Sequence, residues 1–436
     1  MSSNLTLRYT FLKALSGSSL VHLSGAVMAF LVGIQLARGL GVEGYGLYGS
    51  AMAAASLGAT AAAGGVQLHA TREIAALFAR DDEASATRLL TWSIRSVLVL
   101  ALIVCPIVAA YLFWGLGSNF NLILATTAVT LLLAVLMLTG AILRGAGSIV
   151  FGQAINIAWR PFVFSIFLLL ASVTLGSFDS ETAMALGACA CAIALLAGIP
   201  SLIRIWRTGS QSTPASEREK SEWRRNSVVM GTTTIIRAAD AAVPLILVGM
   251  LANFEEAGLY RVAVSSMLLP AMPATMITIM IPAMVVGLYE QNKHEELQRL
   301  SAVSSLIMSL PTLCVAAVLW AFGAPLIVLA FGSEYEAAWL PLTILSAAAL
   351  VTAIGGISNA LLHAARREAV VTRAFGLSLI ITGFGSFLLA QNFGSTGVAI
   401  AVLAAVCVRT SYLVIASIRA TGLDPSLFGA VRRLMW

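Results

Sequence analysis

Residues 17–37 read GSSLVHLSGAVMAFLVGIQLA, and residues 44–68 read GYGLYGSAMAAASLGATAAAGGVQL. Neither run contains a charged residue, and each is long enough as a helix to cross the roughly 30 Å hydrocarbon core of a bilayer. Only the six residues RGLGVE, at 38–43, separate them. This stretch therefore predicts two membrane-spanning helices joined by a short turn.

The rest of the chain repeats this pattern. Ten further apolar windows lie near 91–114, 119–143, 151–175, 181–205, 227–252, 257–288, 300–331, 338–362, 369–391 and 395–417. Hydrophobic residues make up 59% of the 436 residues and charged residues 11%, whereas about 25% of a soluble domain is charged. We therefore expect an all-α, polytopic integral membrane protein with about twelve transmembrane helices, and a soluble protein is excluded.

A polar segment and an internal repeat divide the predicted helices into two lobes of six. Residues 206–226 form a long polar gap that contains Pro214, and the motif E-x-x-G-L-Y occurs at 43–48 and again at 255–260. A weaker echo relates AILRGA at 141–146 to ALLHAA at 360–365. We expect an N-terminal lobe at 1–205, a cytoplasmic linker at 206–226, a C-terminal lobe at 227–417 and a cytoplasmic tail at 418–436. Six helices per lobe give both lobes the same orientation, as in transporters built from parallel repeats.

The basic residues predict the orientation of the chain. Of the 26 Lys and Arg residues, 18 lie at the N-terminus, in the even-numbered loops or at the C-terminus, and seven lie inside the predicted spans, including Arg204 and Arg373 near even-numbered loops. The odd-numbered loops contain only Arg38. Because cytoplasmic loops carry the excess of Lys and Arg, both termini are expected in the cytoplasm.

Motifs for other chemistries are missing from the sequence. There is no H-E-x-x-H, G-x-S-x-G or Walker A motif, and the five cysteines lie in apolar runs. We therefore expect no enzyme activity, no metal and no cofactor. The scattered basic residues form no aromatic–basic patch, so no nucleic-acid partner is expected.

Two arginines predicted near the bilayer centre are the main candidate site residues. Arg237 lies about 15 Å into the seventh span, and Arg160 is at similar depth in the fifth. A lipid-facing arginine at the midplane costs about 2.5–3.5 kcal/mol, which favours a hydrated interior and an anionic ligand for both. For Arg237 the alternative is a structural ion pair with Asp240 one turn away, and for Arg160 it is a helix kink at Pro161 with no ligand.

Three residues complete the set of candidates. Asp240 is the one acidic residue deep in a predicted span, and we assign it to coupling with H⁺ or Na⁺. Arg95 and Arg409 are further candidate substrate contacts. The alternative for these two, and for Arg261, is that the side chains extend toward the membrane surface.

The sequence LARGLGVEGYGLY at 36–48, followed by TREIA at 71–75 and LRGAG at 143–147, resembles the polysaccharide and O-antigen flippases of the Wzx type. These belong to the MOP superfamily, which also contains the MATE drug exporters and the lipid II flippases. The resemblance implies twelve helices in two six-helix lobes in a bacterial inner membrane. Lipid II flippases generally have fourteen spans, so the predicted count disfavours that branch.

The resemblance also implies a function. The expected activity is transfer of an undecaprenyl-diphosphate-linked oligosaccharide from the cytoplasmic to the periplasmic leaflet by alternating access, for synthesis of surface polysaccharides such as O-antigen or exopolysaccharide. Membrane lipid and the components of polysaccharide polymerisation and export are the expected partners. The alternatives are a cation-coupled multidrug exporter of the MATE type and a non-transporting scaffold of a polysaccharide export complex.

Overall fold

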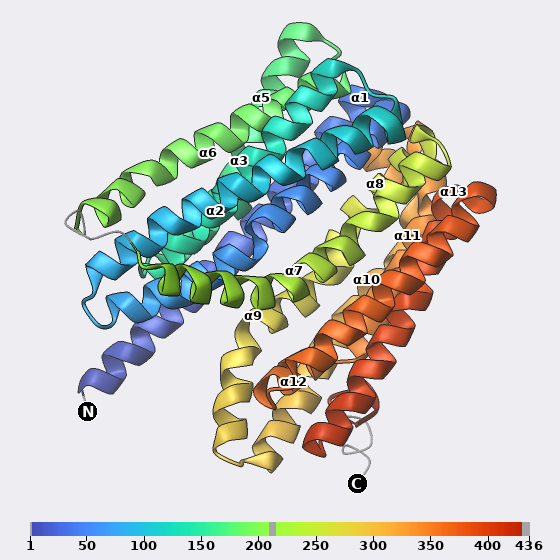
Figure 1. The fold of residues 1–436 in the computed structure, drawn as a ribbon. Helices are drawn as coiled ribbons and strands as arrows, with labels where there is room; N and C mark the ends of the chain where they lie inside the picture. The colour runs from blue at the N-terminus through green and yellow to red at the C-terminus, as the bar shows by residue number, and fades with distance from the viewer. Residues whose placement is uncertain (1, 209–214, 430–436) are drawn as a thin grey trace. The chain divides into compact units, whose positions relative to one another are not determined.

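The computed structural model describes residues 2–208 and 215–429, which contain helices and no strand. Figure 1 shows the helices along the chain. They are α1 (Ser2–Phe78), α2 (Glu83–Ala110), α3 (Phe120–Gly145), α4 (Ile149–Ala154), α5 (Arg160–Leu175), α6 (Ser180–Thr208), α7 (Glu217–Leu251), α8 (Phe254–Ser266), α9 (Leu268–Glu290), α10 (His294–Phe331), α11 (Trp339–Ile354), α12 (Ser358–Ala364) and α13 (Glu368–Thr421).

The predicted fold class is confirmed. Among the described residues, nine helices are long and apolar enough to cross a membrane. Two of them, α1 and α13, each contain one glycine with non-helical dihedral angles, Gly41 (φ 67°) and Gly394 (φ 53°), and each therefore corresponds to two predicted spans. Positive φ angles are accessible to glycine without a steric penalty, so the chain can bend sharply at these two points.

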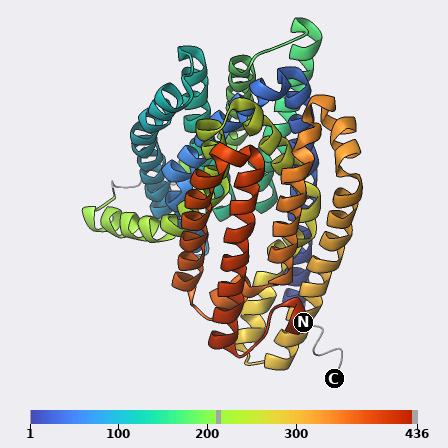
Figure 2. The same cartoon turned by 90° about the vertical axis from the view of Figure 1, so that its right-hand side faces the viewer.

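The helices gather into two compact units, Met1–Ala238 and Ala239–Trp436. In the first unit α1 packs against α2 and α3, and α3 packs against α6. In the second unit α10 packs against α9 and α11, and α11 packs against α13. Figures 1 and 2 show these neighbouring helices running alongside one another within each unit.

Equivalent hydrogen bonds in the two units support the internal repeat. Ser180, the first residue of α6, donates its hydroxyl to the carbonyl of Gly44 in the first E-x-x-G-L-Y copy (2.8 Å). In the second unit Ser395, next to Gly394 of α13, donates its N–H (2.7 Å) and its hydroxyl (2.6 Å) to Glu256 in the second copy. In each unit a serine therefore bonds to the second residue of the motif, at the backbone carbonyl of Gly44 and at the carboxylate of Glu256.

The helix ends repeat as well. After α3, the N–H of Ser148 donates to the carbonyl of Leu143 (2.9 Å); after α12, the N–H of Arg367 donates to that of Leu362 (2.8 Å). The residue before each donor, Gly147 or Arg366, has a positive φ angle. These helices thus end in the same left-handed turn, which satisfies a carbonyl left free at the helix terminus.

The segment predicted as the linker is partly helical in the structure. Residues 206–226 were expected to be a polar connection, but α6 continues to Thr208 and α7 begins at Glu217. Trp223 is only 8% exposed and packs into the core of the first unit. The helix extends into the polar segment because one face of 217–226 packs against α2. The lobe limits at 1–205 and 227–417 remain a prediction; the two compact units divide inside α7.

Two predicted spans are interrupted helices. The window 257–288 is formed by α8 and α9, which meet at Met267. The window 151–175 is formed by α4 and α5, with a π-helical turn at Ile155–Trp159 between them. Because π turns contain an extra residue and often occur at functional sites, the second interruption, directly before Arg160 and Pro161, marks a candidate site.

Candidate functional site

In the second unit Asp240 and Arg409 form an ion pair between α7 and α13. The Nη1 atom of Arg409 donates to Oδ2 of Asp240, and the two side chains are 14% and 11% exposed. The same guanidinium lies 4.7 Å from the ring centroid of Phe375 and 3.4 Å from the hydroxyl of Ser378. Arg409 therefore points into the unit. The alternative that this side chain extends toward the membrane surface is wrong, because a buried carboxylate attracts it.

Asp240 also lines a cavity of about 210 Å³ within the second unit. Tyr260 of α8 and Thr352 of α11 contribute hydroxyl-bearing residues to its wall. Pro244, four residues after Asp240, cannot donate the helical hydrogen bond to the Asp240 carbonyl. The carboxylate, the cavity and the turn weakened by Pro244 therefore lie together in the second unit.

Arg160 follows the π turn in the first unit. Its backbone N–H donates to the carbonyl of Ile155, as the wider π turn requires. The Nε atom of Arg160 is buried and has no hydrogen-bond partner among the described residues. A buried guanidinium N–H without a partner can donate to an anion.

Arg237 is exposed and lies at the end of the first unit's part of α7. Because α7 begins ten residues before the predicted span, Arg237 is about 30 Å from the start of its helix.

The partner of Asp240 is distant in the sequence. The structure pairs Asp240 with Arg409, a residue 169 positions away. Sequence spacing cannot reveal such a distant partner.

Arg95 lies in a groove of the first unit with a volume of about 630 Å³, formed by α1, α2 and α7. We call it the α1–α2–α7 groove. Its lining residues are Ala61, Ala62, Gly65, Val66, Trp92, Arg95, Ser96, Val99, Leu100, Arg224, Ser227, Val228, Gly231, Thr232 and Ile235. Arg224 and Ser227 were not predicted as site residues, because both fall in or next to the presumed linker.

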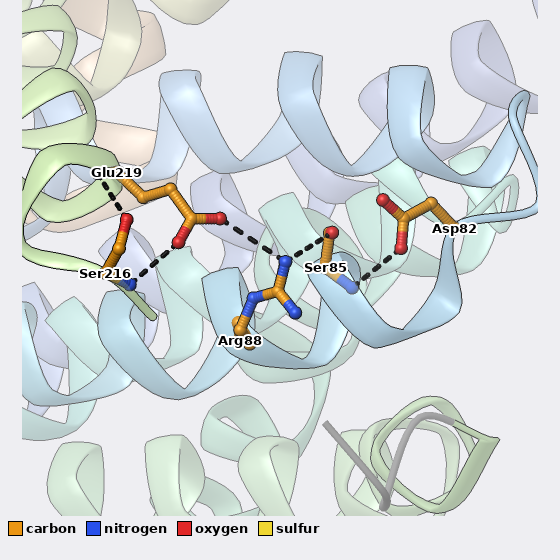
Figure 3. Close-up of polar contacts among 5 residues, drawn as sticks. All are labelled: Asp82, Ser85, Arg88, Ser216 and Glu219. Carbon is orange, nitrogen blue, oxygen red and sulfur yellow. Dashed lines mark hydrogen bonds and ion pairs between the residues drawn. The ribbon is translucent and has the colours of Figure 1, made fainter. Parts of the chain in front are cut away.

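Polar contacts fix the start of α7 beside α2, as Figure 3 shows. Ser216 and Glu219 form a capping box: the Ser216 N–H donates to Glu219 (2.7 Å), and the Glu219 N–H donates to the Ser216 hydroxyl (3.2 Å). The other carboxylate oxygen of Glu219 accepts from Arg88 of α2 (3.3 Å). Arg88 also donates to the Ser85 hydroxyl (2.8 Å).

The same close-up shows the cap of α2 (Figure 3). Asp82 accepts from the Ser85 N–H at 3.0 Å. Hydrogen bonds from the side chain and the backbone of Ser85 lower the pKa of this carboxyl below its ordinary value of 3.8. The carboxylate thus stays ionised at the positive end of α2, where its charge is favourable.

Solved structures share this fold. An inward-facing MATE family multidrug transporter of the MOP superfamily has a TM-score of 0.74 and 14% identity, over 93% of this chain and 98% of that one. The lipid II flippase MurJ in an inward closed conformation has a TM-score of 0.71 and 12% identity, over 96% and 90%. A MOP superfamily transporter from Pyrococcus furiosus Vc1 has a TM-score of 0.63 and 16% identity, over 94% and 96%.

The curated proteins contain no match to this sequence. The profile of one protein family, described as polysaccharide biosynthesis protein, matches residues 11–287. This region includes the first unit from residue 11 onward, α8 and most of α9. The chain is thus an integral membrane protein with the fold of the MOP superfamily, and it belongs to the polysaccharide biosynthesis protein family.

Proposed function

We propose that this protein is a flippase that moves an undecaprenyl-diphosphate-linked oligosaccharide from the cytoplasmic to the periplasmic leaflet of a bacterial inner membrane. The product would enter surface polysaccharide synthesis, and both termini would be cytoplasmic. The family match supports a role in making polysaccharide, and the fold supports membrane transport.

The observation that carries the choice of cargo is the charge balance inside the predicted spans. They contain seven arginines and, deep in a span, one acidic residue, Asp240. The ion pair with Arg409 neutralises that carboxylate. The remaining charge is positive, and a diphosphate that leaves water requires positive partners.

In this proposal Arg160 and Arg237 contact the diphosphate during transfer. The buried, unpartnered Nε of Arg160 supports its role as a donor. Arg95 and Arg409 are the secondary contacts. Asp240 would bind the coupling ion, H⁺ or Na⁺, since protonation or cation binding would weaken its attraction for Arg409.

A MATE-type multidrug exporter is the second candidate, because one such transporter has a TM-score of 0.74 with this chain. Cationic drugs require an available carboxylate within the membrane. Asp240 is engaged by Arg409, and this pairing favours the anionic cargo. The third alternative, a non-transporting scaffold, requires neither the arginines within the spans nor the Asp240 carboxylate for its function.

Reconstitution tests the proposal directly. Proteoliposomes receive a labelled polyprenyl-diphosphate oligosaccharide in one leaflet, and a membrane-impermeant enzyme reports how much label changes leaflet. We expect transfer by the wild type under an imposed H⁺ or Na⁺ gradient, and none by protein-free vesicles. Transfer of cationic drugs without transfer of the glycolipid would support the exporter instead.

Cellular complementation tests the residue roles. Arg160→Ala and Arg237→Ala are expected to abolish surface glycan while the protein still inserts at normal levels. Arg218→Ala, at a side chain that is 90% exposed and pairs with its helix neighbour Glu222, serves as the control. Normal glycan output from both site variants would contradict the assigned roles and support a scaffold.

A further inference from the structure

The α1–α2–α7 groove has an amphipathic lining. The two arginines, Arg95 and Arg224, lie on exposed positions of α2 and α7. Beyond them the wall is apolar and accessible: Val99 is 58% exposed, Leu100 37% and Val228 64%. A groove with two cations and an apolar extension fits a ligand with an anionic head and a hydrocarbon tail.

The helix spacing orders these features along the groove. α2 and α7 are joined near their starts by Arg88 and Glu219, and both helices run onward from this contact. At 1.5 Å per residue, Arg95 and Arg224 lie about 8–10 Å beyond it, whereas Leu100 and Ile235 lie about 18–24 Å beyond it. The charged end therefore precedes the apolar end, which is the order of a head group and chain in a leaflet.

A second observation points to a ligand at the charged end. Ser227 lines the groove, is only 7% exposed, and its hydroxyl has no hydrogen-bond partner within the described part of the chain. It lies one helical turn after Arg224. Burial of an unbonded hydroxyl is unfavourable, so a phosphate oxygen bound between Arg224 and Ser227 would satisfy it.

The walls of the groove are held in place before a ligand binds. Trp92 and Trp223 pack with ring centroids 5.4 Å apart, next to the Arg88–Glu219 contact. On the other side a Cβ atom on Gly231 would lie 3.0 Å from the Cα of Gly65, so α1 and α7 approach closely at this pair. Side chains larger than glycine would separate these two helices.

We propose that the α1–α2–α7 groove is a binding site for a polyprenyl diphosphate in the cytoplasmic leaflet. Arg95, Arg224 and Ser227 bind the diphosphate, and the prenyl chain lies along the apolar surface toward Ile235. This site rests on the proposed function and adds to it a place where the lipid-linked substrate is captured before transfer.

Binding to the purified full-length protein in detergent tests the site without transport. Native mass spectrometry measures the occupancy by polyprenyl diphosphate, by polyprenyl alcohol of the same chain length and by phosphatidylglycerol. We expect the diphosphate to bind most strongly. Replacing both arginines, in R95A/R224A, should weaken this binding about tenfold or more, because each supplies charged hydrogen bonds.

Two further variants separate the head from the tail. Arg225→Ala removes an exposed charge next to Arg224 that does not line the groove, and binding should be unchanged. Thr232→Trp fills the apolar part while both arginines remain, and binding should fall. Misfolding is excluded for each variant whose thermal unfolding temperature equals that of the wild type. If an alanine variant is less stable, Arg95→Gln or Arg224→Gln replaces it.

The outcomes are distinct. Wild-type affinity in R95A/R224A, or equal binding of phosphatidylglycerol, would overturn this inference and assign the groove to ordinary membrane lipid or to none. If the wild type moves labelled glycolipid between leaflets while R95A/R224A binds normally, only the groove assignment fails. If the groove binds the diphosphate but no label changes leaflet, only the proposed function fails.

Discussion

The buried charges show how single residues determine the interior of this protein. A lone carboxylate at the position of Asp240 would be costly in a hydrophobic environment, and Arg409 offsets that cost through a direct hydrogen bond. The aromatic face of Phe375 adds a favourable contact for the guanidinium. Removing one partner therefore destabilises the fold more than removing both, because it leaves a buried charge without its counter-charge.

This pair leads to a stability prediction. Arg409→Ala leaves the Asp240 carboxylate buried and is expected to reduce the free energy of unfolding by about 3–5 kcal/mol. The double variant Asp240→Asn/Arg409→Gln should lose clearly less of the free energy of unfolding than Arg409→Ala, because it leaves no buried charge unpaired. Thermal or denaturant unfolding in detergent measures both, with Arg419→Ala at the exposed end of α13 as control. Equal losses in the single and double variants would contradict this account.

In the first unit one pair of helices packs closely because a glycine of one helix faces a backbone carbonyl of the other. Pro161 lacks the N–H that would bond the Ile157 carbonyl four residues earlier, and the π turn places that carbonyl against Gly25 of α1. The sequence predicted a bend at Pro161. It could not predict that Gly25, 132 positions before Ile157, accommodates it, because the contact is between distant segments.

Gly25→Ala tests this contact. A Cβ at Gly25 would overlap the Ile157 carbonyl oxygen, so we expect a loss of about 1–3 kcal/mol in stability. The same change at Gly383 of α13, where a Cβ meets no atom within 4 Å, should be neutral or stabilising by about 0.5–1 kcal/mol. A loss at Gly383 as large as that at Gly25 would rule out the steric explanation. Unfolding midpoints in detergent provide the comparison.

The start of α2 gives a prediction with a pH dependence. Ser85 lowers the pKa of Asp82 in the folded protein, so the carboxylate stabilises the helix above its ordinary pKa of 3.8. This stabilisation is lost as the pH falls through the lower folded value. Asp82→Ala should therefore cost about 1 kcal/mol at pH 7 and much less once the pH is well below 3.8.

Hydrogen exchange of the first turn of α2 checks this prediction, because the cap protects the Ser85 N–H. The Asp82→Ala variant should exchange faster than the wild type at pH 7, with rates corrected for intrinsic pH effects. The two proteins should converge in acid. Asp81→Ala, at the neighbouring residue with a positive φ angle, is the control for backbone strain. A difference that persists unchanged in acid would exclude the charged cap as its cause.

At the scale of the whole molecule, the chain folds into two units that share sequence motifs. In both E-x-x-G-L-Y copies the second residue accepts from a distant serine, Ser180 or Ser395, and α3 and α12 end in the same turn. Sequence alone showed the repeated motifs. The shared hydrogen bonds are stronger support for duplication, because biased composition does not produce matching long-range contacts.

Cysteine labelling in intact cells tests the orientation. In a variant without the five native cysteines, a cysteine introduced at Asp81 should react with a membrane-impermeant maleimide only after lysis. One introduced at Ser177, in the loop after α5, should react from outside. The reverse pattern would contradict the orientation predicted from the 18 basic residues in the loops and termini of one side.

The sequence by itself determined that the protein spans a membrane, through its composition, and where the apolar helices lie along the chain, through the positions of its apolar runs. These properties depend on residues near one another in the chain, because a helix satisfies its backbone hydrogen bonds internally. The arginines and Asp240 were also identifiable, since charge inside an apolar run is conspicuous.

Only the tertiary structure decided which of these charges meet. It paired Asp240 with Arg409, extended α7 into the presumed linker, and placed Arg224 and Ser227 beside Arg95 in one groove. Each of these outcomes depends on packing between helices far apart in the sequence. The spacing of residues within one helix cannot predict such contacts, because their favourable free energy depends on side chains of another helix that is distant in the sequence.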